Sequence, residues 1–184
     1  MANFHQSRVG RAKLTARRQL TILFPGSAAA QVADDDSFEG GERMTIVKHS
    51  IDAEMAEKAA AAAVTKAGEM KLKMCIAVTD EAGDLKAFLR MDGAPKLSIG
   101  IAQDKAYTAA SFGMPTHAWF DFIKDDPPLL HGITHTPRLT VFGGGFPIVL
   151  KGEMIGAIGL SGGHYTQDME CARAALAAIG ADPL

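Results

Sequence analysis

Residues 141–163, VFGGGFPIVLKGEMIGAIGLSGG, decide the fold expected of this chain. Three glycines at 143–145 precede one apolar run, and Lys151-Gly152 separates this run from a second one. A short glycine-containing break between two apolar runs is typical of a β-hairpin, and Pro147 cannot donate a hydrogen bond within a central ladder. The stretch therefore predicts two antiparallel strands, with glycines where the backbone or a ligand must come close.

The residues on either side predict a second hairpin and several helices. The alternating runs 73–80 and 85–91, joined by the turn-forming residues 81–84, predict the hairpin. Because strands that arrive as hairpins pair antiparallel, the fold class is α+β, with an antiparallel sheet flanked by helices. Four helices are expected: the first follows a cap at Ser50, the second runs from Pro95 to Phe112, the third follows Thr116, and the fourth runs from about Thr166 to Gly180. Residues 125–138 contain three prolines and are expected to form an irregular loop.

Length and composition limit the class of protein. The chain has 184 residues, of which 47% are hydrophobic, and this suits one core rather than two. We expect an N-terminal extension or arm at residues 1–43 and one domain at residues 44–184. A net charge of −2 without a basic stripe argues against nucleic acid as a partner. No apolar run reaches the roughly 18 residues of a membrane span, so none is expected.

The two cysteines and the N-terminal sequence bear on the cellular compartment in which the protein is expected. Cys75 and Cys171 lie in an expected strand and helix and form no C-x-x-C motif, so we expect buried free thiols in a reducing cytoplasm. Arg17-Arg18 before LTILF offers an alternative, export through an atypical N-terminal signal. The apolar part of that signal ends at Pro25 and is short for its type, so the cytoplasm is the expected location.

Three further stretches extend the pattern: RMDGA at 90–94, DKAYTAASFGMPT at 104–116 and QDMECARAAL at 167–176. Together with residues 141–163 they resemble the GlcG/HbpS family of small haem-binding-type proteins, also found as the C-terminal domain of PduO-like cobalamin adenosyltransferases. The resemblance spans residues 45–182. It implies a profilin-like fold with about five strands, a homo-oligomer that can exceed a dimer, and a small ligand that is haem or another tetrapyrrole in part of the family.

Charged and glycine-rich positions of this region are the candidate ligand contacts. Arg90 or Lys105 can pair with a carboxylate, either a haem propionate or a small organic acid, through a charge-assisted hydrogen bond. The backbone amides near Ser161 lie where a helix begins and can hold an anion. Two alternatives to ligand contact stay open: the charged side chains can pair with other groups of the protein, and the glycines can serve only to form turns. The expected ligand-binding set is Arg90, Asp92, Lys105, Gly144, Gly145, Ser161 and Gly162.

Histidines are the candidate iron ligands, because one neutral imidazole nitrogen suffices to coordinate haem iron. His131 and His135 form an H-x-x-x-H pair and are the expected axial-ligand candidates. The same spacing can bind zinc on a helix, but the surrounding prolines argue against a helix there, and the glutamate of H-E-x-x-H is absent. Three other histidines stay open as axial ligands: His49, His117 and His164.

The alternative function is an enzyme that acts on a small carboxylate or hydroxylated metabolite. Arg90 or Lys105 would anchor the acid, and a histidine or aspartate would transfer the proton. Residues 159–163 also match G-x-S-x-G, but a serine hydrolase of that type needs a mostly parallel sheet. The glycines at 143–145 lack the Lys-Ser/Thr pair of a phosphate-binding loop, which disfavours a nucleotide. The sequence leaves open whether the protein is an enzyme.

Overall fold

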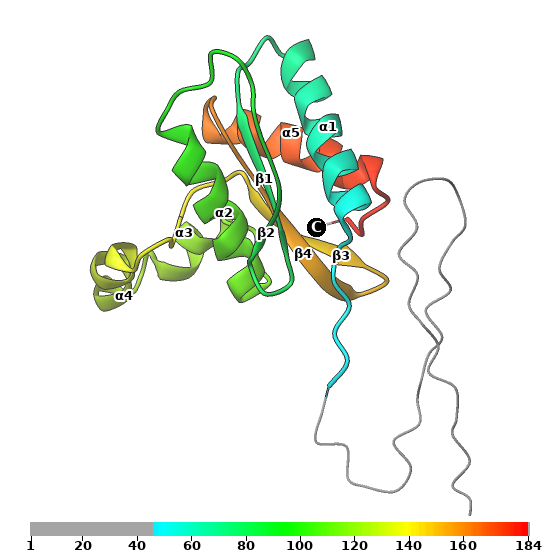
Figure 1. Cartoon of the computed structure of the whole chain (residues 1–184). Coiled ribbons are helices and arrows are strands. Elements are labelled where there is room, and N and C mark those ends of the chain that lie inside the picture. The colour runs from blue at the N-terminus through cyan, green and yellow to red at the C-terminus, as the bar shows by residue number, and fades with distance from the viewer. Residues whose placement is uncertain (1–45, 184) are drawn as a thin grey trace, which may run out of the picture. The chain divides into compact units, whose positions relative to one another are not determined.

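A four-stranded antiparallel sheet forms the centre of the computed structural model, which describes residues 46–183 (Figure 1). The strands are β1 (Cys75–Asp80), β2 (Leu85–Arg90), β3 (Gly145–Leu150) and β4 (Glu153–Ser161), in the order β2-β1-β4-β3. The two pairs that are adjacent in sequence are the predicted hairpins, and β1 joins them by pairing with β4. The predicted α+β class with an antiparallel sheet is confirmed.

The expectation of about five strands is wrong for the described residues, which contain four. The segment before the first helix does meet β4, where the Ile51 amide donates to the Ile155 carbonyl at 2.8 Å. A single bond of this kind does not make a ladder, so the segment is not a strand. β2 and β3 are consequently the two edges of the sheet.

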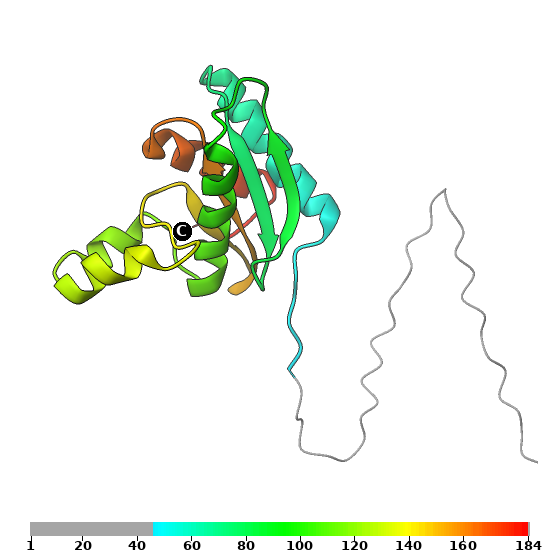
Figure 2. The same cartoon turned by 60° about the vertical axis from the view of Figure 1, so that its left-hand side comes forward.

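Helices cover both faces of the sheet (Figures 1 and 2). α1 (Ala53–Glu69) and α5 (Tyr165–Ala178) pack side by side on one face, and α2 (Ser98–Phe112) packs on the other. The short helices α3 (Ala118–Ile123) and α4 (Pro127–Gly132) and a 3-10 turn (Ile133–His135) follow α2 in the chain. Both views place α3 and α4 on the side of the body away from α1.

Small side chains let the helices approach the sheet closely. On the far side of the sheet from α1, Gly159 of β4 lies directly beneath α2. A Cβ on Gly159 would meet the Ala102 carbonyl oxygen and lie 2.5 Å from the Ala106 nitrogen. The glycine is therefore required by contact between two backbones rather than by a turn. α1 uses alanine in the same way, since its buried residues are Ala56, Ala59, Ala60, Ala63 and Ala67.

Side-chain caps fix the starts of α1 and α5. α1 begins after Asp52, whose carboxylate accepts a hydrogen bond from the backbone amide three residues later at 2.7 Å. The cap predicted at Ser50 is thus placed two residues too early. α5 begins after His164, two residues before the predicted cap Thr166. The His164 amide donates to the Gln167 side chain at 2.9 Å.

The irregular loop predicted for residues 125–138 is also wrong in its first half. Asp126 caps α4, and its carboxylate accepts from the Leu129 amide at 3.2 Å. Pro127 and Pro128 occupy the first turn of that helix. Proline is tolerated there because the first helical amides have no acceptor within the helix.

Cys75 and Cys171 are buried free thiols, as predicted. Burial raises the pKa of Cys171 to about 11, so this thiol is protonated at neutral pH. None of the helices within residues 46–183 is long and apolar enough to cross a membrane. The predicted arm at residues 1–43, with its Arg17-Arg18 signal, lies outside the described residues.

Candidate functional site

A fully buried ion pair joins α2 to α5, which lie on opposite faces of the sheet. Lys105 on α2 and Asp168 in the first turn of α5 are 0% and 2% exposed. The Lys105 ammonium donates to Asp168 Oδ2 at 2.6 Å and to the Leu160 carbonyl at 2.8 Å. Burial lowers the pKa of Lys105 and raises the pKa of Asp168, and the attraction between the two charges opposes both shifts. The predicted ligand contact Lys105 therefore already has an anionic partner within the chain.

The glycine run 143–145 closes over this ion pair. Gly144 has a φ of +116°, and a Cβ there would lie 2.7 Å from both the Lys105 ammonium nitrogen and the Asp168 Cβ. A Cβ on Gly145 would lie 2.5 Å from the Lys105 carbonyl oxygen. Only glycine permits this approach together with a left-handed backbone at Gly144. Contact of Gly144 or Gly145 with a ligand stays a prediction.

The turn between β4 and α5 satisfies one of its amides from within the chain. The Gly163 amide donates to Asp168 Oδ1 at 3.2 Å, so Asp168 occupies one of the amides that the sequence offered as a possible anion site. Ser161 is buried at the end of β4, and Gly162 has a φ of +153°. The antiparallel sheet also lacks the architecture in which G-x-S-x-G presents a nucleophile. A ligand contact by Ser161 or Gly162 stays a prediction.

Arg90 and Asp92 lie at the opposite edge of the sheet from the glycine run. Arg90 ends β2, and its guanidinium donates to the Ala94 carbonyl at 3.1 Å, while Asp92 is exposed in the turn that follows. Cys75 pairs with Arg90 on one side and with Ser161 on the other, so about 10 Å of sheet separates Arg90 from Ser161. The structure therefore does not gather the predicted ligand-binding set into one place within the chain.

His131 and His135 are exposed, on α4 and on the 3-10 turn. Their surroundings add no further ligands, since residues 46–183 contain no cluster of three or more potential metal-binding side chains. An exposed imidazole provides one bond to iron but no apolar enclosure for a porphyrin. Their role as axial ligands stays a prediction.

An open hollow of about 330 Å³ lies beside the glycine run, and we call it the aromatic hollow. α3 supplies one wall, and the segment that leads into β3 supplies another. The Lys105 ammonium lies 4.9 Å from the centre of the Phe142 ring, which connects the hollow to the buried ion pair. The lining residues are His117, Phe120, Val141, Phe142, Gly143 and Tyr165.

His117, the residue before α3, is the imidazole of the aromatic hollow. Its Nδ1 atom is buried without a hydrogen-bond partner among the described residues. Burial lowers the pKa of His117, the positive charge of Arg173 adds to this effect, and Asp121 opposes it. A neutral imidazole keeps a lone pair on one ring nitrogen, and this is the form that coordinates iron. Sequence reasoning left His117 as one of several histidines because no local motif signals a buried imidazole.

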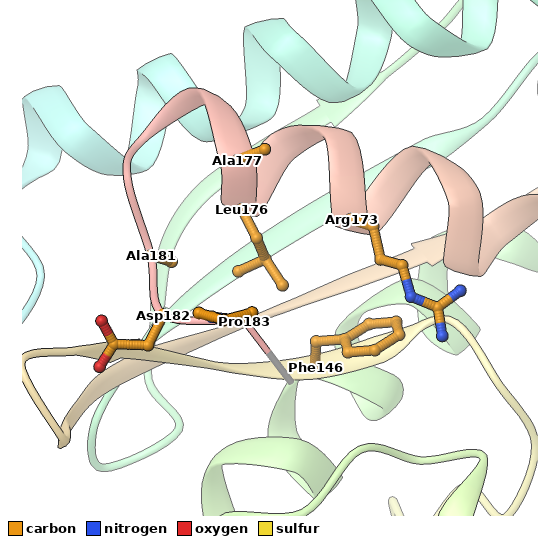
Figure 3. A pocket seen from close by; sticks show the side chains of 7 residues that line it. All are labelled: Phe146, Arg173, Leu176, Ala177, Ala181, Asp182 and Pro183. Atoms are coloured by element: carbon orange, nitrogen blue, oxygen red, sulfur yellow. The ribbon is translucent and has the colours of Figure 1, made fainter.

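A second hollow, of about 210 Å³, lies between β3, α5 and residues 181–183 (Figure 3), and we call it the α5 hollow. The Arg173 guanidinium lies 5.3 Å from the centre of the Phe146 ring. The His117 ring lies 5.5 Å from the same ring, so Phe146 stands between the two hollows. Sequence reasoning missed Arg173, although it lies within the stretch 167–176 that carries the family resemblance, because no spacing or partner in the sequence marks it as a ligand contact. The lining residues are Phe146, Arg173, Leu176, Ala177, Ala181, Asp182 and Pro183.

The sequence model of a protein family described as haem degrading protein HbpS-like matches residues 51–177. This chain belongs to that family. The resemblance to GlcG/HbpS proteins is thereby confirmed. The matched residues include all four strands and also His117 and Arg173, so both hollows lie largely within the family domain.

Individual relatives extend this result. An uncharacterized 15.0 kDa protein from the dhaT-dhaS intergenic region of Citrobacter freundii is 38% identical over 123 residues, which are 66% of this chain and 86% of that protein. Protein GlcG of Escherichia coli K12 is 33% identical over 108 residues, which are 59% of this chain and 78% of GlcG. The crystal structure of a PduOC:Heme complex has a TM-score of 0.68 at 29% identity and covers 72% of this chain and 97% of its own. A protein of this fold thus binds haem.

Proposed function

We propose that this protein binds haem, or another tetrapyrrole, in the aromatic hollow with His117 as the axial ligand of the iron. The observation that carries the proposal is the His117 imidazole, which lines the aromatic hollow among aromatic side chains and is the only histidine among its lining residues. The haem complex of a protein with the same fold supports it. When bound, haem supplies an iron that accepts axial ligands and exchanges electrons.

The aromatic hollow fits the apolar face of a tetrapyrrole. Phe120, Phe142 and Tyr165 are 54%, 43% and 44% exposed, so their rings are available for a ligand to cover. Pockets that enclose a drug-sized ligand measure roughly 300–1,000 Å³, and the hollow, at about 330 Å³, is at the small end of that range. A tetrapyrrole would therefore be held along one edge while the rest of its ring stays outside the chain.

Burial, assisted by the charge of Arg173, keeps His117 in the form that binds iron. Because burial and Arg173 lower its pKa below the ordinary value of 6.5, the imidazole stays neutral as the pH falls through 6.5 and protonates only in more acidic solution. Protonation of His117 removes the lone pair that would coordinate iron. Haem affinity is therefore expected to be constant above pH 6.5 and to fall only below it, through the lowered pKa.

Replacing His117 with alanine is expected to weaken haemin binding at least about tenfold, because the iron loses its protein ligand. The measurement is a titration of haem-free protein with haemin, followed by the Soret band. His131→Ala and His135→Ala are matched controls, since both remove an exposed imidazole outside the aromatic hollow. Both controls are expected to bind haemin as the unaltered protein does.

Two results would contradict this proposal. Absence of saturable haemin binding by the unaltered protein would remove haem as the ligand. Unchanged affinity in His117→Ala, with a loss in His131→Ala or His135→Ala, would move the iron ligand to the exposed pair on α4 and the 3-10 turn.

An enzyme for small carboxylates has less support from the geometry. Lys105, one of its predicted anchors, lies beneath the glycine run and is paired with Asp168. Arg90, the other anchor, donates to the Ala94 carbonyl. This function stays the alternative predicted from the sequence, and loss of turnover in Arg90→Ala is its test.

We also expect the chain to assemble with copies of itself through the β2 edge. Within the part of the chain that the structure describes, β2 has one unpaired side, and Leu85, Phe88 and Leu89 on it are exposed. Sheet edges with exposed apolar side chains are normally protected by pairing or burial. Phe88→Glu is expected to lower the assembly mass measured by light scattering, whereas Lys86→Glu, on the same strand, keeps the apolar contacts and is the control. A monomeric unaltered protein would contradict this expectation.

A further inference from the structure

We propose that the α5 hollow binds a short apolar monocarboxylate, with Arg173 as the group that receives the carboxylate. The hollow is distinct from the aromatic hollow, because Phe146 stands between them, and its occupation does not depend on haem. Two features carry the proposal: a cation without an acidic partner among residues 46–183 at one end, and apolar walls over the rest.

Arg173 offers the positive charge. No carboxylate within residues 46–183 lies within ion-pair distance of its guanidinium. Asp182, which also lines the hollow, accepts a hydrogen bond from the Gly152 amide at 2.8 Å, and in Figure 3 its carboxylate points away from Arg173. A guanidinium presents parallel donors that match the two oxygens of a carboxylate. The hollow therefore selects an anion at its Arg173 end.

Apolar groups from three parts of the chain form the rest of the hollow. Phe146 is buried in β3, Leu176 is buried in α5, and Pro183 lies in the segment after α5. The hollow is open to solvent on one side, and its volume of about 210 Å³ admits one ring or a short chain. An apolar body gains from covering these walls, whereas a polar body would lose hydrogen bonds to water on the side that it turns toward them.

The two ends of the hollow favour a single acid group. Figure 3 places Arg173 and Asp182 at opposite ends, with Leu176 and Pro183 between them. A second carboxylate on the ligand would approach the negative charge of Asp182 and be repelled. The expected ligand therefore carries one carboxylate on an apolar body, and benzoate is a suitable probe for it.

Saturation-transfer difference NMR with benzoate tests the site in the full-length, haem-free protein. Benzoate is expected to bind saturably with a Kd on the order of 1 mM, as suits a ligand of its size. Benzamide keeps the ring without the charge, and acetate keeps the charge without the ring. Each is expected to bind at least about tenfold more weakly than benzoate.

Three variants locate the binding. Arg173→Gln is expected to weaken benzoate at least about tenfold and to leave benzamide unchanged, because only the charge-assisted bond is lost. Ala177→Leu keeps Arg173 and fills the hollow, so it is expected to weaken both probes. Lys58→Gln removes an equal charge from the exposed surface of α1 and is expected to change neither. Thermal unfolding of each variant checks that it is folded.

Benzoate affinity that is unchanged in Arg173→Gln would overturn the proposal, as would equal affinities of the unaltered protein for benzoate and benzamide. His117→Ala separates this proposal from haem binding, because it is expected to lose haemin affinity and to keep benzoate affinity. A protein that binds benzoate and no haemin would support the α5 hollow and contradict only the aromatic hollow as a haem site.

Discussion

Gly159→Ala is expected to destabilise the protein by about 3 kcal/mol or more. Gly159 lies in β4 beneath α2, where an added Cβ would meet the Ala102 carbonyl oxygen and lie 2.5 Å from the Ala106 nitrogen. Both groups belong to the backbone of α2, so no change of side-chain rotamer relieves the clash. α2 must move away from the sheet, and the contacts of its buried alanines are lost. Urea unfolding followed by circular dichroism measures the change in free energy of unfolding.

Gly68→Ala is the matched control for this variant. Gly68 lies in α1, and an added Cβ there has no neighbour within 4 Å. Alanine is preferred to glycine within a helix by roughly 0.5–1 kcal/mol, so the control is expected to gain about that much stability. A Gly159→Ala protein as stable as the unaltered one would mean that α2 does not rest on β4 at this glycine.

Local sequence signals predict the hairpins and the long helices because neighbouring residues determine those elements. Lys151 and Gly152 adopt φ values of +53° and +80°, the left-handed backbone that a two-residue reversal between strands requires. The same signals fail where the deciding partner is distant. A glycine within a strand indicates a close backbone neighbour, but the identity of that neighbour, α2 in the case of Gly159, depends on packing.

The candidate sites were less accessible to sequence reasoning for the same physical reason. Lys105 and Asp168 are 63 residues apart, and their side chains pair beneath the glycine run although α2 and α5 lie on opposite faces of the sheet. His117 and Arg173 approach Phe146 from different helical segments, and only the folded chain brings them together. Spacing along the sequence identifies partners on one helix or hairpin, whereas the packing of distant segments decides which groups surround an imidazole or a guanidinium.

Lys105→Met is expected to destabilise the protein by about 3–5 kcal/mol, because it leaves the carboxylate of Asp168 buried without its cation. The Gly163 amide, at 3.2 Å, is the other donor to that carboxylate that the described residues provide. Methionine is unbranched and flexible and fills much of the space of the lysine side chain. The loss of stability is therefore due mainly to the missing charge and less to a cavity. Denaturant unfolding at equal protomer concentration measures the effect.

The double variant Lys105→Met/Asp168→Leu shows whether the intact ion pair stabilises the fold or whether only breaking it is costly. Replacing both members of a buried pair with apolar groups is often neutral or stabilising by about 1–4 kcal/mol, because neither charge must be desolvated. We therefore expect the double variant to regain most of the stability that Lys105→Met loses. Lys66→Met is the control, since Lys66 pairs with a more exposed carboxylate at 2.8 Å and its loss is expected to change the free energy of unfolding far less. A Lys105→Met effect no larger than that of the control would contradict a dry ion pair beneath the glycine run, because only exclusion of water makes an unpaired Asp168 so costly.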